Sequence, residues 1–159
     1  MKADQKVIGI GFLPFTLIEG HWRIFTIKEL KSKPEINKES EMISFPIETI
    51  EKRDKSEEGA LLRLIDEETG ITLKQIRFYE VVPGRFSSVD RKGLEMIYAY
   101  GVFNGNYRQN FTPRDTDIVY AGWWTIEELL SFPKIRIEVS PILRHFIASG
   151  YLNKLASHS

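Results

Sequence analysis

The sequence of 159 residues contains no cysteine, which excludes disulfides, thiolate metal sites and cysteine nucleophiles. This absence fits a reducing compartment, and the cytoplasm is the expected location. The chain also has no excess of positive or negative charge, because 22 basic residues balance 22 acidic ones. The balance argues against a partner such as long nucleic acid, which is held by bulk charge. No segment reaches the roughly 18 apolar residues that span a bilayer, so no membrane partner is expected.

Several catalytic patterns are missing as well. There is no Gly-x-Ser-x-Gly elbow and no Walker-type loop, so serine hydrolase and P-loop chemistry have no support. The three histidines, His21, His145 and His158, are scattered and show no metal-ligand spacing. Hydrophobic residues make up 42% of the chain, which is enough to bury a core. The length favours one domain over 1–159.

Apolar runs separated by polar segments predict a mixed α/β fold. Strands are expected over 6–18, 21–28, 42–45, 75–82, 95–103 and 118–124. Glu19 and Gly20 separate the first two runs as a hairpin turn would. The polar segments 29–41 and 104–117 are predicted to be solvated loops. Strands, a central helix, more strands and terminal helices indicate a mixed sheet flanked by helices.

Three helices follow from capping and spacing signals. Residues 57–69 carry an apolar stripe, with Ser56 as the expected N-cap and Gly70 as the stop. Thr125 and Glu128 form a capping box before a short helix that reaches Leu130. Ser140 and Pro141 are expected to open the last helix, which Gly150 would end.

The segment Arg63-Leu64-Ile65-Asp66-Glu67-Glu68-Thr69-Gly70-Ile71 resembles the signature of the Nudix hydrolase family, G-x5-E-x7-R-E-U-x-E-E-x-G-U, where U is aliphatic. The Phe45-Pro46 pair and the segment 122–129 resemble further parts of that family. The resemblance covers roughly residues 6–148 and implies an α/β (α+β) fold, namely a Nudix-type α/β/α sandwich with a mixed β-sheet.

Clustered carboxylates point to a divalent cation. Positions 64, 67 and 68 share one face of the predicted helix, and clustered carboxylates repel each other unless a hard cation joins them. The resemblance implies that Glu67 and Glu68 bind Mg²⁺ or Mn²⁺ and are catalytic together with Arg63. Arg63 reaches Glu67 at the i+4 spacing and would orient that carboxylate.

The first half of the signature departs from the family pattern. The glutamate after the arginine is Leu64, which can be neither a metal ligand nor a base. The first signature glutamate is Lys55, which would repel Arg63 where the family has an ion pair. The paired glycines are also replaced, since Ile47 and Glu48 follow the Phe-Pro pair.

Other residues could supply what is lost. Substitute carboxylates are available at Glu48, Glu51, Asp115 and Asp117. Aromatic and guanidinium groups could stack on a base and pair with phosphate. The residues of this kind that we expect to bind substrate are Arg85, Tyr107, Arg108, Arg114 and Trp124. The alternative is an ordinary polar surface for the arginines and Tyr107, which the loop composition somewhat favours, and core packing for Trp124.

Two functions follow from this pattern. The first is Mg²⁺-dependent hydrolysis of the pyrophosphate bond in a nucleoside diphosphate linked to another moiety. The alternative is an inactive Nudix-fold module that binds a nucleotide-like ligand or a protein partner, since Leu64 suits a packed or partner-facing surface. Family members are often dimers, so the resemblance also leaves a homodimer open.

Overall fold

The computed structural model describes residues 7–36, 38–87 and 94–159. The strands are β1 (Val7–Ile18), β2 (His21–Glu29), β3 (Ile43–Ser44), β4 (Ile47–Thr49), β5 (Ile76–Val81), β6 (Phe86–Ser87), β7 (Leu94–Phe103) and β8 (Ile118–Trp124). The α-helices are α1 (Glu57–Glu68), α2 (Ile126–Ser131), α3 (Val139–Ala148) and α4 (Tyr151–Ala156), and short 3-10 turns η1 (Pro34–Ile36) and η2 (Leu73–Gln75) complete the order.

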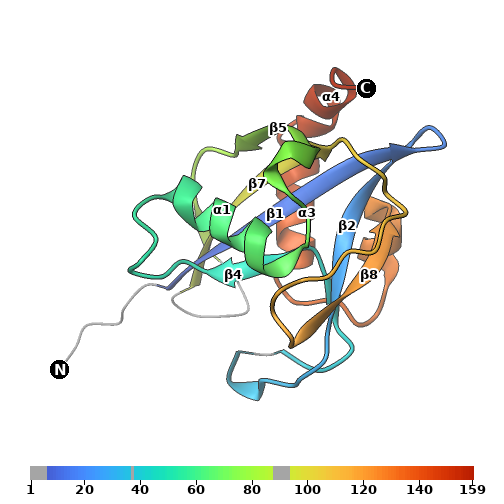
Figure 1. The fold of residues 1–159 in the computed structure, drawn as a ribbon. Helices are drawn as coiled ribbons and strands as arrows, with labels where there is room; N and C mark the ends of the chain where they lie inside the picture. Colours follow the sequence, from blue (N-terminus) through green and yellow to red (C-terminus); the bar gives the residue numbers. More distant parts are fainter. Residues whose placement is uncertain (1–6, 37, 88–93) are drawn as a thin grey trace.

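The described strands form one eight-stranded sheet of mixed direction. Its main path runs β3-β2-β1-β7-β5, with β8, β4 and β6 paired to β2, β1 and β7. The central strand β1 pairs in parallel with β7 and antiparallel with β2 and β4. Helix α1 crosses one face of this sheet and α3 lies on the other (Figure 1). The predicted α/β/α sandwich with a mixed sheet is therefore confirmed.

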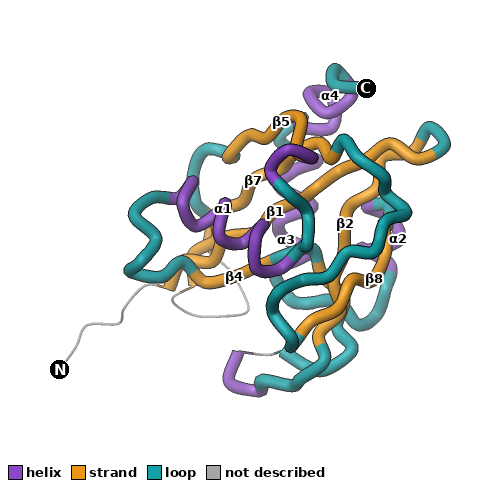
Figure 2. The backbone as a smooth tube through the Cα atoms, in the orientation of Figure 1, coloured by secondary structure: helices purple, strands orange, loops and turns teal. Residues whose placement is uncertain are grey.

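Each face of the sheet carries its own apolar cluster. Neighbouring residues of a strand point to opposite faces, so Phe12 of β1 joins Leu61 of α1, whereas Leu13 joins Phe146 of α3. The tube in Figure 2 shows the central strands between the two helical layers. Strands covered on both faces read as continuous apolar runs, which is why the sequence shows little alternation there.

Most element boundaries match the prediction within two residues. The N-cap at Ser56 is present, with its hydroxyl accepting from the Gly59 amide, and so is the Thr125–Glu128 capping box. The helix predicted to open at Ser140 and Pro141 corresponds to α3, which begins at Val139, and the short α4 that follows Gly150 was not predicted. The strand expected over 42–45 is shorter, and β4 forms directly after Pro46.

The segment 29–41 is not simply a solvated loop, as the mixed charges suggested. Glu29 is the last residue of β2 and is buried. Lys33 and Lys38 exchange two backbone hydrogen bonds, 2.6 and 3.1 Å long, which close the segment into a compact turn. Both lysines thereby lie against the body of the protein, where they line a cavity.

Gly70 is held in a conformation that other residues rarely adopt. Its φ is +74°, and a Cβ placed on it would lie 2.7 Å from the Thr112 backbone nitrogen. We expect Gly70→Ala to lower the free energy of unfolding by about 2–3 kcal/mol, from backbone strain plus the clash. Gly150→Ala is the matched control, because Gly150 has φ +79° but no atom within 4 Å of the position that a Cβ would take. Denaturant unfolding should show a clearly smaller loss, about 1 kcal/mol, for the control.

Candidate active site

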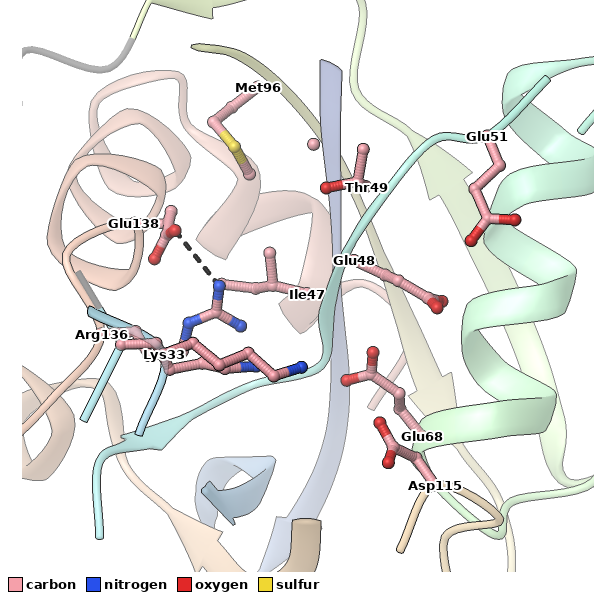
Figure 3. Close-up of a pocket in the computed structure, with 12 residues that line it drawn as sticks. Lys33, Ile47, Glu48, Thr49, Glu51, Glu68, Met96, Asp115, Arg136 and Glu138 are labelled. Atoms are coloured by element: carbon pink, nitrogen blue, oxygen red, sulfur yellow. Dashed lines mark hydrogen bonds and ion pairs between the residues drawn. The ribbon is translucent and has the colours of Figure 1, made fainter. Parts of the chain in front are cut away.

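A cavity of about 210 Å³ opens where the C-terminal end of α1 meets β4 and the segment around Lys33. Five acidic residues line it, namely Glu48, Glu51, Glu68, Asp115 and Glu138. Three basic residues, Lys33, Lys38 and Arg136, line it too. Figure 3 shows Glu48, Glu68 and Asp115 on one side and Lys33 and Arg136 on the other. The cavity therefore has an acidic wall around Glu68 and an opposite wall, here called the basic wall, in which Glu138 accompanies Arg136 and the lysines.

Glu68 is the central carboxylate of the acidic wall. It is only 5% exposed, and among the described residues it makes no hydrogen bond or ion pair. Burial raises the pKa of Glu68 well above its usual value, and the nearby Glu48 carboxylate raises it further. A buried carboxylate without a donor is costly in its charged form, so this position favours a bound cation or proton.

Glu48 is the second carboxylate, and it reaches the cavity from β4. One oxygen lies 2.7 Å from an Arg63 guanidinium nitrogen, while Oε2 is buried with no hydrogen-bond partner. Burial raises the pKa of Glu48 to about 7, and Arg63 only partly offsets this. The sequence named Glu48 as a candidate substitute, and the structure brings it to the same cavity as Glu68.

Arg63 organises the acidic side chains behind this wall. Besides Glu48, its guanidinium bonds both oxygens of Asp54 at 2.8 Å and Glu67 at 3.1 Å. The sequence predicted that Lys55 would repel Arg63 in place of the family ion pair; the structure instead gives Arg63 an ion pair with Asp54, one residue before Lys55. Sequence reasoning missed Asp54 because the signature fixes a spacing that this chain shifts by one residue.

The ion pair of Asp54 makes a testable contribution to stability. Its bidentate bond to Arg63 lowers the pKa of Asp54 from 3.8 to about 2. A lowered folded-state pKa stabilises the protein above pH 3.8 and loses that effect as the pH falls toward 2. We expect Asp54→Asn to cost about 1–2 kcal/mol near pH 6, after allowance for solvent screening.

Urea unfolding of Asp54→Asn and wild type between pH 6 and pH 2 measures this difference. The difference in the free energy of unfolding between the two proteins should become smaller as the pH drops. Asp66→Asn serves as control, since Asp66 bonds Arg114 on the exposed surface and should cost less than about 1 kcal/mol. If the difference in the free energy of unfolding between Asp54→Asn and wild type does not change with pH, the assigned ion pair is contradicted.

The basic wall was not predicted. Buried Glu29 lies 3.3 Å from the Lys38 ammonium and 3.6 Å from the Arg136 guanidinium, and Arg136 also bonds Glu138 at 3.2 Å. The Arg136 amide donates to the carbonyl of Ile43, which fixes this segment against β3. A period-two pattern does not explain this pairing, because Glu138 has helical dihedral angles (φ −75°, ψ −21°) and the Val139 amide donates to the Arg136 carbonyl in a turn before α3.

Leu64 does not lie in the cavity. It is fully buried in the apolar cluster between α1 and the sheet, with Leu61 and Ile65. Of the two surfaces considered for Leu64, the structure supports the packed one and excludes the partner-facing one. Where the family signature has a glutamate, this chain thus has an apolar side chain that packs in the core.

The remaining predicted carboxylates are distributed unevenly. Glu67 does not line the cavity, and both its oxygens are paired with arginines, Arg63 at 3.1 Å and Arg53 at 3.4 Å. Asp115 lines it and is fixed by its amide, which donates to the Glu67 carbonyl. Glu51 lies at the rim beside Arg53, whereas Asp117 bonds Lys31 outside the cavity.

The five residues expected to bind substrate are not brought together. Arg85 pairs with Glu57, Arg114 pairs with Asp66, and neither lines the cavity. Tyr107 lies beneath the Arg108 guanidinium, 5.3 Å from it, near another surface depression. Trp124 packs edge-on against Phe132 and donates its indole N–H to the Ala121 carbonyl. The hypothesis of a single nucleotide-binding surface from these residues gains no support.

The acidic wall fits a divalent cation that keeps most of its water. The described residues contain no group of three or more histidine, aspartate or glutamate side chains arranged around a metal position. Glu68 is nevertheless buried, the half-buried Glu48 is near enough to raise its pKa, and Glu48 Oε2 has no hydrogen-bond partner. Mg²⁺ is commonly held by one or two carboxylates and completed by water and phosphate, so two such ligands suffice.

The fold and this cavity define an α/β/α sandwich with an acidic site at the end of its central helix. A family model described as the NUDIX domain matches residues 14–146. The chain therefore belongs to the Nudix family, and the predicted resemblance is confirmed.

Solved structures agree with this assignment at the level of the fold. The chain is similar to the NUDIX domain of Shewanella oneidensis NrtR in complex with ADP ribose, with 16% identity, a TM-score of 0.64, and 86% of this chain and 82% of that one covered. A Caenorhabditis elegans Ap4A hydrolase is 16% identical, with a TM-score of 0.61, and the match covers 89% of this chain and 96% of that one. A NUDIX hydrolase from Nitrosomonas europaea is 18% identical, with a TM-score of 0.63, and the match covers 94% of this chain and 91% of that one.

The comparison with curated proteins gave no match. Within 7–36, 38–87 and 94–159, none of the helices is both long and apolar enough to cross a membrane.

Proposed function

We propose that the protein hydrolyses the pyrophosphate bond of a nucleoside diphosphate linked to another moiety, with Mg²⁺ or Mn²⁺ as cofactor. One observation carries the proposal: Glu68, buried and without a donor, faces a cavity that it shares with Glu48. Family membership and the ADP ribose bound to the NrtR domain support a substrate of this class. The cytoplasmic location and the homodimer stay predictions.

In this proposal Glu68 and Glu48 hold the cation, and Asp115 adds negative charge at the edge of the site. Arg63 is a positioning residue, because it fixes one oxygen of Glu48 and orients Glu67. The bound cation would neutralise diphosphate charge and polarise water. In hydrolysis the oxygen of water would bond to one phosphorus, the bond from that phosphorus to the bridging oxygen would break, and the bridging oxygen would leave on the other phosphate with its electron pair, while the proton of the water would pass to the solvent.

A substrate panel tests this function. The protein is incubated with Mg²⁺ or Mn²⁺ and ADP-ribose, dinucleoside polyphosphates or nucleoside triphosphates, and the phosphate products are separated and quantified. We expect metal-dependent cleavage of at least one diphosphate-linked compound, and no cleavage in EDTA. If none of the compounds is cleaved, with Mg²⁺ or with Mn²⁺, the proposal is overturned.

The alternative, an inactive module, has one specific observation in its favour. Leu64 removes a carboxylate from the signature and serves the core, so the acidic wall has fewer ligands than the family pattern provides. Such a module would bind a nucleotide-like ligand in the same cavity without turning it over. Calorimetry that detects ADP-ribose binding, together with a silent panel, would favour it.

A further inference from the structure

A second and larger cavity, here called the outer groove, lies between the last turns of α1 and the turn and η2 that follow this helix. Its volume is about 750 Å³, which is within the roughly 300–1,000 Å³ of sites that hold a small molecule. The loop before β8 closes one side of the groove with Arg114. The outer groove shares no lining residue with the candidate active site, so the proposed hydrolysis leaves it without a role.

The inner surface of the outer groove is apolar. Ile65 and Ile71 are buried beneath it, and Leu62 of α1 is half-buried. Leu73 of η2 is 54% exposed, the highest exposure among the large hydrophobic side chains of the described residues. A ligand that covers Leu62 and Leu73 therefore gains the free energy of removing apolar surface from water.

The charged residues of the outer groove favour an anion. Lys74 is exposed, and its ammonium forms no ion pair among the described residues. Arg114 bonds Asp66 at 2.6 Å, which neutralises the carboxylate of the groove and holds the guanidinium at its edge. A guanidinium has five N–H donors, so Arg114 keeps donors for a ligand. The positive charge of Lys74 remains in excess.

The end of α1 opposes this preference only weakly. The C-terminal end of a helix carries a partial negative charge on its last carbonyl groups. Two of these carbonyls already accept hydrogen bonds, that of Ile65 from the Thr69 hydroxyl at 2.6 Å and that of Glu67 from the Asp115 amide at 2.9 Å. The full charge of Lys74 therefore outweighs the partial charge that the helix leaves at the groove.

We propose that the outer groove binds a small molecule with an apolar body and one anionic group, of the class of aliphatic or aromatic carboxylates and sulfonates. The apolar body lies against Leu62 and Leu73, and the anionic group pairs with Lys74 and with donors of Arg114. A neutral molecule of the same shape binds more weakly, because it leaves Lys74 unpaired. A small inorganic anion also binds more weakly, because it leaves Leu73 in water.

Fluorescence titration with 8-anilinonaphthalene-1-sulfonate tests this site, because this aromatic anion has both features and fluoresces more strongly away from water. N-phenyl-1-naphthylamine is the matched neutral probe, since it lacks only the sulfonate. We expect Leu73→Ser to weaken the binding of both probes about fivefold. Lys74→Gln should weaken the binding of the sulfonate about threefold and change that of the neutral probe less than about 1.5-fold.

Leu152→Ser and Lys55→Gln are the matched control variants. Leu152 is another exposed leucine, at 37%, and Lys55 is another exposed lysine without an ion pair among the described residues. Neither lines the outer groove, so both variants should bind the two probes within about 1.5-fold of wild type. Circular dichroism verifies that all four variants are folded.

Three results would overturn the proposal. The first is a wild-type protein that does not bind the sulfonate, and the second is a Leu73→Ser or Lys74→Gln variant that binds it as the matching control does. The third is a Lys74→Gln variant that loses affinity for both probes equally, because the charge would then have no part in binding. The titration contains no metal and no substrate, so its outcome is independent of the proposed hydrolysis.

Discussion

Glu68→Gln is expected to reduce metal-dependent hydrolysis about 100-fold or more. Removing the charge of Glu68 removes a ligand of the cation, which is worth several kcal/mol of transition-state stabilisation, and each 1.36 kcal/mol is a factor of about ten in rate. The variant should fold as well as wild type or better, since burial already disfavours the charged carboxylate. Steady-state rates and thermal unfolding measured on the same preparation separate the two effects.

The matched control is Glu58→Gln, which removes one negative charge from the first turn of the same helix. Glu58 is exposed and bonds the Tyr79 hydroxyl, away from the cavity. The rate of metal-dependent hydrolysis by the Glu58→Gln variant should stay within about twofold of wild type. If Glu68→Gln retains the wild-type rate while wild type is active, the assignment of Glu68 is wrong.

Leu64→Glu, which would restore the glutamate that follows the arginine in the family signature, is expected to destabilise the protein by about 4 kcal/mol or more. Leu64 is 0% exposed in the cluster beneath α1. The substitution removes buried apolar surface and places an unpaired carboxylate among apolar side chains, and both effects are among the largest that single substitutions produce. Denaturant unfolding should show a strongly lowered midpoint, and the activity should fall with it.

Leu64→Met controls for this effect, because it conserves volume and should cost less than about 1.5 kcal/mol. A Leu64→Glu variant that is as stable as Leu64→Met would contradict the packed environment described for this residue. If that stable variant also gained hydrolysis, position 64 would belong to the cavity and the inactive-module alternative would explain wild type.

The fold was accessible from the sequence because its signals are local. Ser56, Thr125 and Glu128 cap their helices by contacts within three residues, and the long apolar runs need two covered faces. The start of α3 at Val139, slightly before the predicted Ser140 and Pro141, has a nonlocal cause. The Val139 amide donates to Arg136, and Arg136 is fixed by Ile43 far away in sequence, so the helix begins before its proline.

The site was only half predictable. Glu68 and Glu48 could be named because the signature and the Phe-Pro pair set their register. The pairing of Arg63 with Asp54, and the buried group around Glu29, depend on which segments the sheet brings together. Arg85, Arg108 and Arg114 show the opposite error, since residue type alone does not say which surface a loop faces.

The proposed function requires that Glu48 and Glu68 hold a divalent cation in this cavity. The most direct test is a crystal grown with Mn²⁺ and measured at a wavelength where manganese scatters anomalously. We expect an anomalous peak inside the cavity, with oxygens of both carboxylates at about 2.1–2.3 Å from the ion, as for hard cations of this size. An empty cavity, or a peak that neither carboxylate contacts, would contradict it.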